Sequence, residues 1–149
     1  MENEMTLTFA AVSENEALAR MTLTFFIASL DPTLEEISEY KTVISEAATN
    51  AIIHGYGEDP SGMVEVRAML EGREVTVTIS DKGRGISDVD EAMQPMFTTK
   101  PDDERSGMGF TIMESFTDNL KVESAPGSGT TVTFKKTFSP VPEVCRTTG

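Results

Sequence analysis

The chain has 149 residues, one cysteine and a formal net charge of −13, with 38% hydrophobic and 25% charged residues. These values are typical of one globular domain with its own core, and a single cysteine excludes an internal disulfide. The negative charge argues against duplex nucleic acid as a partner, because phosphate contacts require clustered Lys and Arg. We expect a cytoplasmic protein with a basic partner surface, since no signal-peptide pattern or membrane-length apolar run is visible.

The first segments predict an edge strand followed by a helix. Residues 5–10 alternate apolar and polar side chains with a period of two, as strands do. Such a strand at a sheet edge can pair with a second copy of the chain, which would give a homodimer, or it can serve as an edge within one molecule. Ser13 and Glu16 form a capping-box pattern, which predicts a helix from there to about Ala28.

Arg20 stands out in this helix, because it is the only basic residue before Lys41 in a segment rich in acidic residues. It can pair with Glu16, four residues earlier on the same helix face. Alternatively it contacts a protein partner, and we name it as a candidate partner-binding residue.

A second capping box, Thr33 with Glu36, begins a long helix that carries the most informative stretch of the chain. Glu46, Asn50 and His54 follow at four-residue intervals, so a regular α-helix places them on one face that looks into solvent or into a polar cavity. A carboxylate one turn from a carboxamide suits phosphoryl transfer. The amide oxygen can bind Mg²⁺, and the carboxylate can accept a proton from an attacking hydroxyl. We expect His54 to hydrogen bond at the helix end rather than to contact ligand.

Two glycine clusters follow this helix. Residues 75–80 alternate as a strand and lead into the first cluster, DKGRG at 81–85, and a polar stretch then leads to the second, SGMGF at 106–110. Glycine lets the backbone approach a ligand closely, and a helix that begins at the second cluster would offer free N–H groups to phosphate. Residues 98–106 contain nothing to anchor in a core, and we expect a mobile lid there.

The remaining segments complete the predicted architecture. The strands expected are a hairpin of 63–70 with 74–80 and a hairpin of 120–124 with 130–136, and the further helices expected are a short one at 88–92 and one from Gly107 to about Thr117. The sum is three substantial helices on a mainly antiparallel sheet of about five strands, a two-layer α/β sandwich. We predict one domain over residues 1–137 and a disordered tail over 138–149.

The motifs together resemble a known superfamily. Glu46 with Asn50, then DKGRG, then SGMGF, then Gly129-Thr130-Thr131 resemble, in order, the motifs of the ATPase superfamily of gyrase B subunits, heat-shock chaperones, MutL proteins and histidine kinases. Within it, EAATNAIIHGY and FTTKPDDERSGMGFTIMESF resemble the small anti-sigma serine kinases of spore-forming bacteria. The resemblance covers roughly residues 5–136 and implies an α+β fold, a mixed, mainly antiparallel sheet packed on helices, and a homodimer.

The resemblance also implies roles for individual residues. It implies that Asp81 accepts the adenine amino group, that Asn50 holds Mg²⁺, and that Glu46 is the catalytic base. Arg105 is the candidate cation for the γ-phosphate, with Lys100 as its competitor. The residues expected to bind the nucleotide are Asn50, Asp81, Gly83, Gly85, Thr98, Lys100, Ser106, Gly107, Gly109 and Thr130.

For the whole protein, the resemblance implies an anti-sigma factor. Such a protein would inhibit a sporulation sigma factor and use Mg-ATP to phosphorylate a serine of a small anti-anti-sigma protein. Two alternatives stay open: a sigma-sequestering module in which ATP only orders the lid, and an ATP hydrolase that works as a conformational clamp. The sequence contains no Walker A loop and no calcium loop, so those nucleotide and metal sites are excluded.

Overall fold

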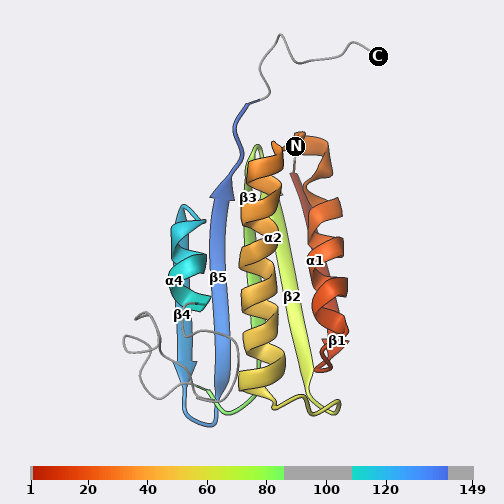
Figure 1. The fold of residues 1–149 in the computed structure, drawn as a ribbon, viewed down its shortest axis with the longest axis vertical. Coiled ribbons are helices and arrows are strands. Elements are labelled where there is room, and N and C mark those ends of the chain that lie inside the picture. Colours follow the sequence, from red (N-terminus) through yellow and green to blue (C-terminus); the bar gives the residue numbers. More distant parts are fainter. Residues whose placement is uncertain (1, 86–108, 141–149) are drawn as a thin grey trace.

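The computed structural model describes residues 2–85 and 109–140 and arranges them as one five-stranded sheet with helices on one of its faces (Figure 1). The strands are β1 (Glu2–Ala10), β2 (Met63–Glu71), β3 (Glu74–Asp81), β4 (Asn119–Ala125) and β5 (Gly129–Thr137). The helices are α1 (Asn15–Phe26), the 3₁₀ turn η1 (Ala28–Leu30), α2 (Leu34–Thr49), the π-helical turn η2 (Asn50–Gly55) and α4 (Gly109–Ser115).

The strand order is β1-β2-β3-β5-β4, and every pairing in it is antiparallel. The predicted two-layer sandwich is therefore confirmed, and the described sheet is antiparallel throughout rather than mixed. The N-terminal strand lies at a sheet edge, as predicted. None of the helices in the described part of the chain has the length and apolarity that a membrane crossing requires.

The central strands turn alternate side chains toward the helices, because successive residues of a strand point to opposite faces. The inward rows are Val64, Val66, Ala68 and Leu70 on β2, Val75, Val77, Ile79 and Asp81 on β3, and Thr130, Val132, Phe134 and Lys136 on β5. Asp81 ends the β3 row and pairs with Thr130 across the ladder. The strand pattern thus carries a carboxylate into the space between sheet and helices.

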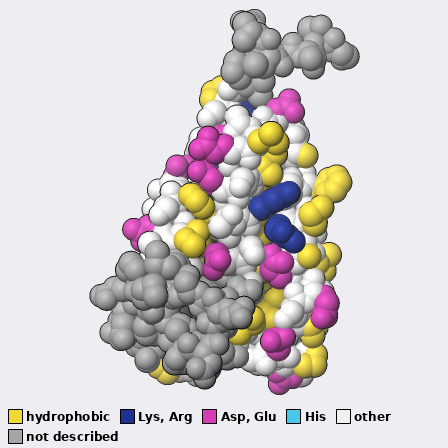
Figure 2. All heavy atoms as spheres, viewed as in Figure 1, with side chains coloured by type: hydrophobic (Ala, Val, Ile, Leu, Met, Phe, Trp, Pro, Cys, Tyr) yellow, Lys and Arg dark blue, Asp and Glu magenta, His cyan; other side chains and the backbone are white. Residues whose placement is uncertain are grey.

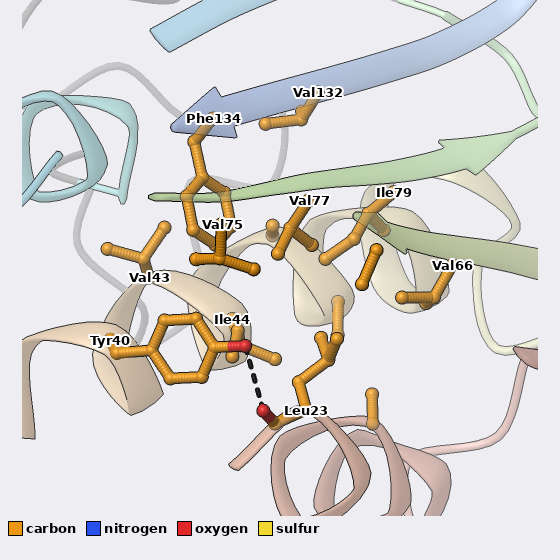
Figure 3. Packing of buried hydrophobic residues seen from close by; sticks show 14 of the residues in the cluster. Leu23, Tyr40, Val43, Ile44, Val66, Val75, Val77, Ile79, Val132 and Phe134 are labelled. Atoms are coloured by element: carbon orange, nitrogen blue, oxygen red, sulfur yellow. Dashed lines mark hydrogen bonds between the residues drawn. The ribbon is translucent and has the colours of Figure 1, made fainter. Parts of the chain in front are cut away.

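Tyr40 of α2 lies in the core between the helices and the sheet, where it contacts both layers (Figure 3). Its hydroxyl donates to the Leu23 carbonyl of α1 at 2.8 Å, and its ring lies edge-on to Phe134 and Phe138, with centroids 6.2 and 5.7 Å away. Phe138 is only 1% exposed. The core therefore extends past residue 137, where we predicted that the domain would end.

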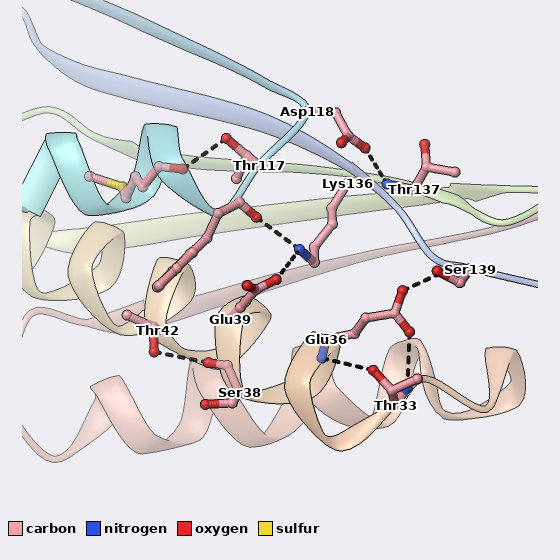
Figure 4. A network of polar contacts seen from close by, with 12 residues as sticks. Thr33, Glu36, Ser38, Glu39, Thr42, Thr117, Asp118, Lys136, Thr137 and Ser139 are labelled. Carbon is pink, nitrogen blue, oxygen red and sulfur yellow. Dashed lines mark hydrogen bonds and ion pairs between the residues drawn. The ribbon is translucent and has the colours of Figure 1, made fainter.

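One of the inward side chains of β5 is charged. Lys136 is 8% exposed, and its Nζ donates to Glu39 Oε1 at 3.1 Å and to the Phe116 carbonyl at 2.9 Å (Figure 4). Glu39 belongs to α2, and Phe116 follows α4 directly. This buried ammonium group consequently ties the end of α4 to α2, with its charge compensated by a carboxylate.

Only one of the two predicted capping boxes forms. Thr33 Oγ1 accepts the Glu36 N–H at 3.1 Å and Glu36 Oε1 accepts the Thr33 N–H at 3.0 Å (Figure 4). Ser13, in contrast, donates its hydroxyl to Glu58 Oε2 at 2.6 Å, and α1 begins after Glu14 without a side-chain cap. The prediction for Ser13 is wrong because a carboxylate from a distant turn takes its hydroxyl.

Candidate functional site

The predicted acid–amide pair lies where α2 passes into η2. Glu46 and Asn50 are both partly buried, and Gly109, the first residue of α4, packs against them. A Cβ atom placed on Gly109 would lie 2.9 Å from Glu46 Oε2 and 3.7 Å from Asn50 Nδ2. Any larger residue at this position would have to push the carboxylate aside. The fold therefore brings the end of the second glycine cluster to the acid and the amide.

The helix that carries this pair ends in a π-helical turn, which the sequence pattern does not indicate. The Tyr56 N–H donates to the Ala51 carbonyl, five residues back, at 3.2 Å. In a π-turn the hydrogen bonds span five residues instead of four, so the four-residue spacing no longer keeps side chains on one face. The predicted stripe holds for Glu46 and Asn50, but the regular spacing that would add His54 stops at Asn50.

Asp81 lies at the far end of η2, where its carboxylate packs against Gly55. A Cβ on Gly55 would lie 2.8 Å from Asp81 Cγ, so glycine is needed for this approach. The Asp81 side chain is buried, with Oδ1 accepting the Gly83 N–H at 2.9 Å. Burial raises the pKa of this carboxyl, although hydrogen bonds from the backbone of Gly83 and Thr130 oppose the shift. A buried acceptor at a strand end suits recognition of an amino group.

The two glycines of the first cluster have packing roles within the protein. A Cβ on Gly83 would collide with the Gly55 carbonyl, and one on Gly85 would collide with the Ala125 carbonyl. Gly85 also has a φ of +75°, which other residues rarely adopt. Both glycines thus let the loop lie close to the backbone of Gly55 and Ala125. Their expected contact with a nucleotide base stays a prediction.

Thr130 faces Asp81 across the ladder and is nearly buried, at 9% exposure. Ser124 donates its hydroxyl to the Gly129 carbonyl at 2.9 Å, and its oxygen lies 2.8 Å from Thr130 Oγ1. A hydroxyl has only one proton, so Thr130 is the donor in the second contact. Its Oγ1 is left as an acceptor for a water or a ligand beside Asp81.

The remaining predicted site residues lie outside the described residues. These are Thr98, Lys100, Arg105, Ser106 and Gly107, together with the predicted helix at 88–92 and the predicted lid. Their roles stay predictions.

Arg20 lies on α1, with its Nε 3.4 Å from Glu16 Oε1 and its side chain 39% exposed. The predicted pairing with Glu16 is confirmed, and the contact with a protein partner stays a prediction. Figure 2 shows basic, acidic and hydrophobic side chains side by side on the surface over α1 and α2. The large exposed hydrophobic residues of α1 are Leu18, Met21 and Phe25, at 45%, 51% and 78% exposure.

The acid–amide pair can contribute to a magnesium site but cannot build one alone. No group of three or more His, Cys, Asp or Glu that could hold a metal occurs among the residues that the structure describes. Mg²⁺ usually keeps several waters and binds through one or two protein oxygens plus substrate phosphates. Asn50 lies one helical turn after Glu46 and carries an amide oxygen, so it fits an ion that arrives with a nucleotide.

Three residues of this region were not predicted to take part in it: Gly55, Tyr56 and Ser124. The sequence marks Gly55 as a helix terminator, which it is, but its contact with Asp81 depends on the fold. Tyr56 follows η2, and its hydroxyl accepts the Lys82 N–H at 2.7 Å. No local pattern signals this bond, since it joins segments that are distant in sequence.

Comparison with known families gives a match over most of the chain. The family of the histidine kinase-like ATPase domain matches residues 9–136. An anti-sigma F factor of Lysinibacillus sphaericus is 64% identical over 138 residues, which are 93% of this chain and 94% of that protein. An anti-sigma F factor of Bacillus subtilis strain 168 is 54% identical over 145 residues, covering 97% of this chain and 99% of that protein.

Solved structures share the fold. The RsbU and RsbW domains of Rv1364c from Mycobacterium tuberculosis match with a TM-score of 0.67 and 23% identity, over 93% of this chain and 32% of that one. The catalytic domain of histidine kinase ThkA matches with a TM-score of 0.57 and 17% identity, over 91% of this chain and 97% of that one. At these identities the likeness concerns architecture alone.

Proposed function

This chain belongs to the anti-sigma F factor family of histidine kinase-like ATPases, and we propose that it inhibits a sporulation sigma factor and phosphorylates a serine of an anti-anti-sigma protein with Mg-ATP. The observation that carries the kinase proposal is the contact of Gly109 with both Glu46 and Asn50. A module that only binds nucleotide has no need for a carboxylate at this position.

The proposed nucleotide lies along α2 and η2. Asp81 and Thr130 bind the adenine end beside Gly55, and Asn50 and the backbone at Gly109 bind the phosphate end. Glu46 lies on α2 and Gly55 ends η2, so the two residues occupy different levels of this helical segment. This separation keeps the recognition of the base apart from the reacting phosphate.

In the proposed reaction, Glu46 accepts the proton of an incoming serine hydroxyl while the γ-phosphoryl group passes to the serine oxygen and ADP leaves. Asn50 offers its amide oxygen to Mg²⁺, which would neutralise charge on the phosphates when bound. Arg105, or Lys100 in its place, would bind the γ-phosphate oxygens. These two cations lie outside the described residues, so their part rests on the sequence motif.

The charge and the exposed residues of the chain support the proposal that it binds protein partners. The net charge of −13 favours a basic partner surface, and Arg20, paired with Glu16, places a basic residue in an acidic N-terminal segment. The hydrophobic residues of α1 and the edge strand β1 support a homodimer. A sigma factor as partner places the protein in the cytoplasm.

The function is tested by adding Mg-ATP and a purified anti-anti-sigma protein to the chain and analysing both by mass spectrometry. The kinase proposal expects one phosphoserine on the partner and none on this chain. Phosphate release without a modified partner would instead identify a hydrolase. Nucleotide binding without either product would identify a sequestering module, and both of these results contradict the kinase proposal.

A further inference from the structure

The Tyr56 side chain joins the end of η2 to the loop that follows Asp81. Its oxygen accepts the Lys82 N–H at 2.7 Å, and its O–H donates to the Met63 carbonyl at 2.8 Å. A Cβ on Gly62 would lie 2.5 Å from the Tyr56 ring, so the ring rests directly on the backbone there. Both the hydroxyl and the ring of Tyr56 are therefore held in place.

The same loop is fastened to η2 at two further points. The Arg84 N–H donates to the Gly55 carbonyl at 3.0 Å, and Arg84 Nε donates to the His54 carbonyl at 2.6 Å. Carbonyl groups at the end of a helix have no intrahelical partner, and here the loop supplies the donors. Three consecutive residues, His54 to Tyr56, thus hold the Arg84 side chain and the backbone of Arg84 and Lys82.

The orientation of the Asp81 side chain depends on this attachment, because Asp81 immediately precedes the bonded residues Lys82 and Arg84. The Gly83 N–H donates to Asp81 Oδ1, and the Gly55 backbone contacts the same carboxylate. A shift of the loop would move the Gly83 donor and would turn the carboxylate. The direction in which Asp81 presents its acceptor is consequently set by the attachment of the loop to η2.

We propose that Tyr56 is a positioning residue for base recognition: its hydroxyl fixes the loop after Asp81 so that the carboxylate meets the amino group of adenine. This inference rests on the proposed function, since it assigns a role within the same nucleotide site. Lys82 is exposed, so water can satisfy its N–H when the tyrosine hydroxyl is lost. The main effect of losing the hydroxyl therefore falls on nucleotide selectivity rather than on folding.

The test is Tyr56→Phe, which removes the hydroxyl and keeps the ring. Calorimetric titration with Mg-ATP is expected to show affinity reduced roughly fivefold to tenfold, as for one lost hydrogen bond. Affinity for Mg-GTP, which lacks the adenine amino group, should stay unchanged, so the preference for ATP falls. In the transfer reaction the KM for ATP should rise while kcat at saturating ATP stays near the wild-type value.

The matched control is Tyr40→Phe, which also removes a tyrosine hydroxyl bonded to a carbonyl at 2.8 Å, but within the core. It should lower the Tm and leave both nucleotide affinities unchanged. The chain has two tyrosines and no tryptophan, so Tyr40→Phe leaves Tyr56 as the only tyrosine or tryptophan fluorophore. Its emission should then change when Mg-ATP is added.

Arg84→Met provides a second variant, because it removes only the side-chain bond to His54. It should show the same selective loss of ATP affinity, and it carries the test if Tyr56→Phe does not fold. Wild-type affinity for both nucleotides in these variants would overturn the inference, as would an equal loss for ATP and GTP. Failure of the wild-type chain to bind ATP would contradict the proposed function itself.

Discussion

Asp81 combines a cost to stability with a proposed role in recognising the nucleotide base. The alternation of β3 turns its carboxylate inward, and burial raises its pKa above the ordinary value of 3.8. A raised pKa means that the folded state holds the proton more tightly than the unfolded state does. Ionisation therefore disfavours the folded state, and this cost grows as the pH rises above the ordinary aspartate value.

We predict that Asp81→Asn raises the Tm at neutral pH and abolishes detectable ATP binding. The gain in stability should disappear as the pH falls to the ordinary aspartate value of 3.8, where the wild-type carboxyl binds its proton. Thermal unfolding of both proteins across this pH range checks the sign. A variant less stable than wild type at neutral pH would contradict the assignment.

Glu46 is the residue on which the proposed chemistry depends. We predict that Glu46→Gln binds Mg-ATP within about twofold of wild type but transfers phosphate roughly 100-fold more slowly, because the amide cannot accept the proton. Glu35→Gln, an exposed change in the first turn of the same helix, is the matched control and should affect neither property. Equal transfer rates in Glu46→Gln and wild type would remove the role of a base.

At the scale of elements, the two capping boxes show what a local pattern can and cannot establish. The side chains of Thr33 and Glu36 each accept a hydrogen bond from the other residue's backbone N–H. Both residues lie within four positions of the chain, so the sequence alone predicts these bonds. Ser13 has the same pattern but bonds to Glu58. That residue comes close only after the chain has folded past η2.

The difference leads to a paired prediction. Thr33→Ala should cost about 1 kcal/mol, which corresponds to a Tm lower by roughly 2–4 °C. Ser13→Ala removes an exposed contact but no helix cap, so its effect should stay within about 0.5 kcal/mol. Thermal unfolding of both variants measures the contrast. Equal losses would show that the cap of α2 is not the stabilising feature.

The strands were predictable and the end of the long helix was not. The alternation of apolar residues predicted the bounds of β2 and β3 to within one residue. These two strands pair antiparallel because a short turn connects them. The pattern of residues 50–55 is that of an ordinary helix. Its π-helical form accompanies contacts with Asp81 and Arg84, which lie in another segment. For the same reason, the sequence did not predict the contact of Gly109 with Glu46, and the family resemblance implied only that both residues belong to one nucleotide site.

At the scale of the whole molecule, α1 presents hydrophobic residues to solvent despite the acidic character of the chain. Leu18, Met21 and Phe25 are spaced three and four residues apart, which places them on one helix face, and all are exposed. An exposed apolar stripe beside polar residues is typical of an interaction surface. The edge strand β1 packs against the same helix.

We predict that the wild-type chain sediments as a dimer and that Phe25→Glu shifts it to the monomer, since it introduces a charge into the stripe. Lys121→Glu on β4, at the opposite edge of the sheet, is the control and should leave the dimer intact. Sedimentation equilibrium distinguishes the two states. A monomeric wild type would contradict the proposed homodimer.

The account as a whole requires that the acid–amide pair, the start of α4 and the loop after β3 form one Mg-ATP site. Calorimetric titration of Mg-ATP into the wild type and Gly109→Ala tests this directly. We predict saturable binding of one nucleotide per chain in the wild type and affinity at least about tenfold weaker in the variant. The added methyl group would lie 2.9 Å from Glu46 Oε2 and would push the Gly109 backbone away from its proposed place at the phosphates. No heat with wild type at millimolar nucleotide, or identical binding by both proteins, would contradict it.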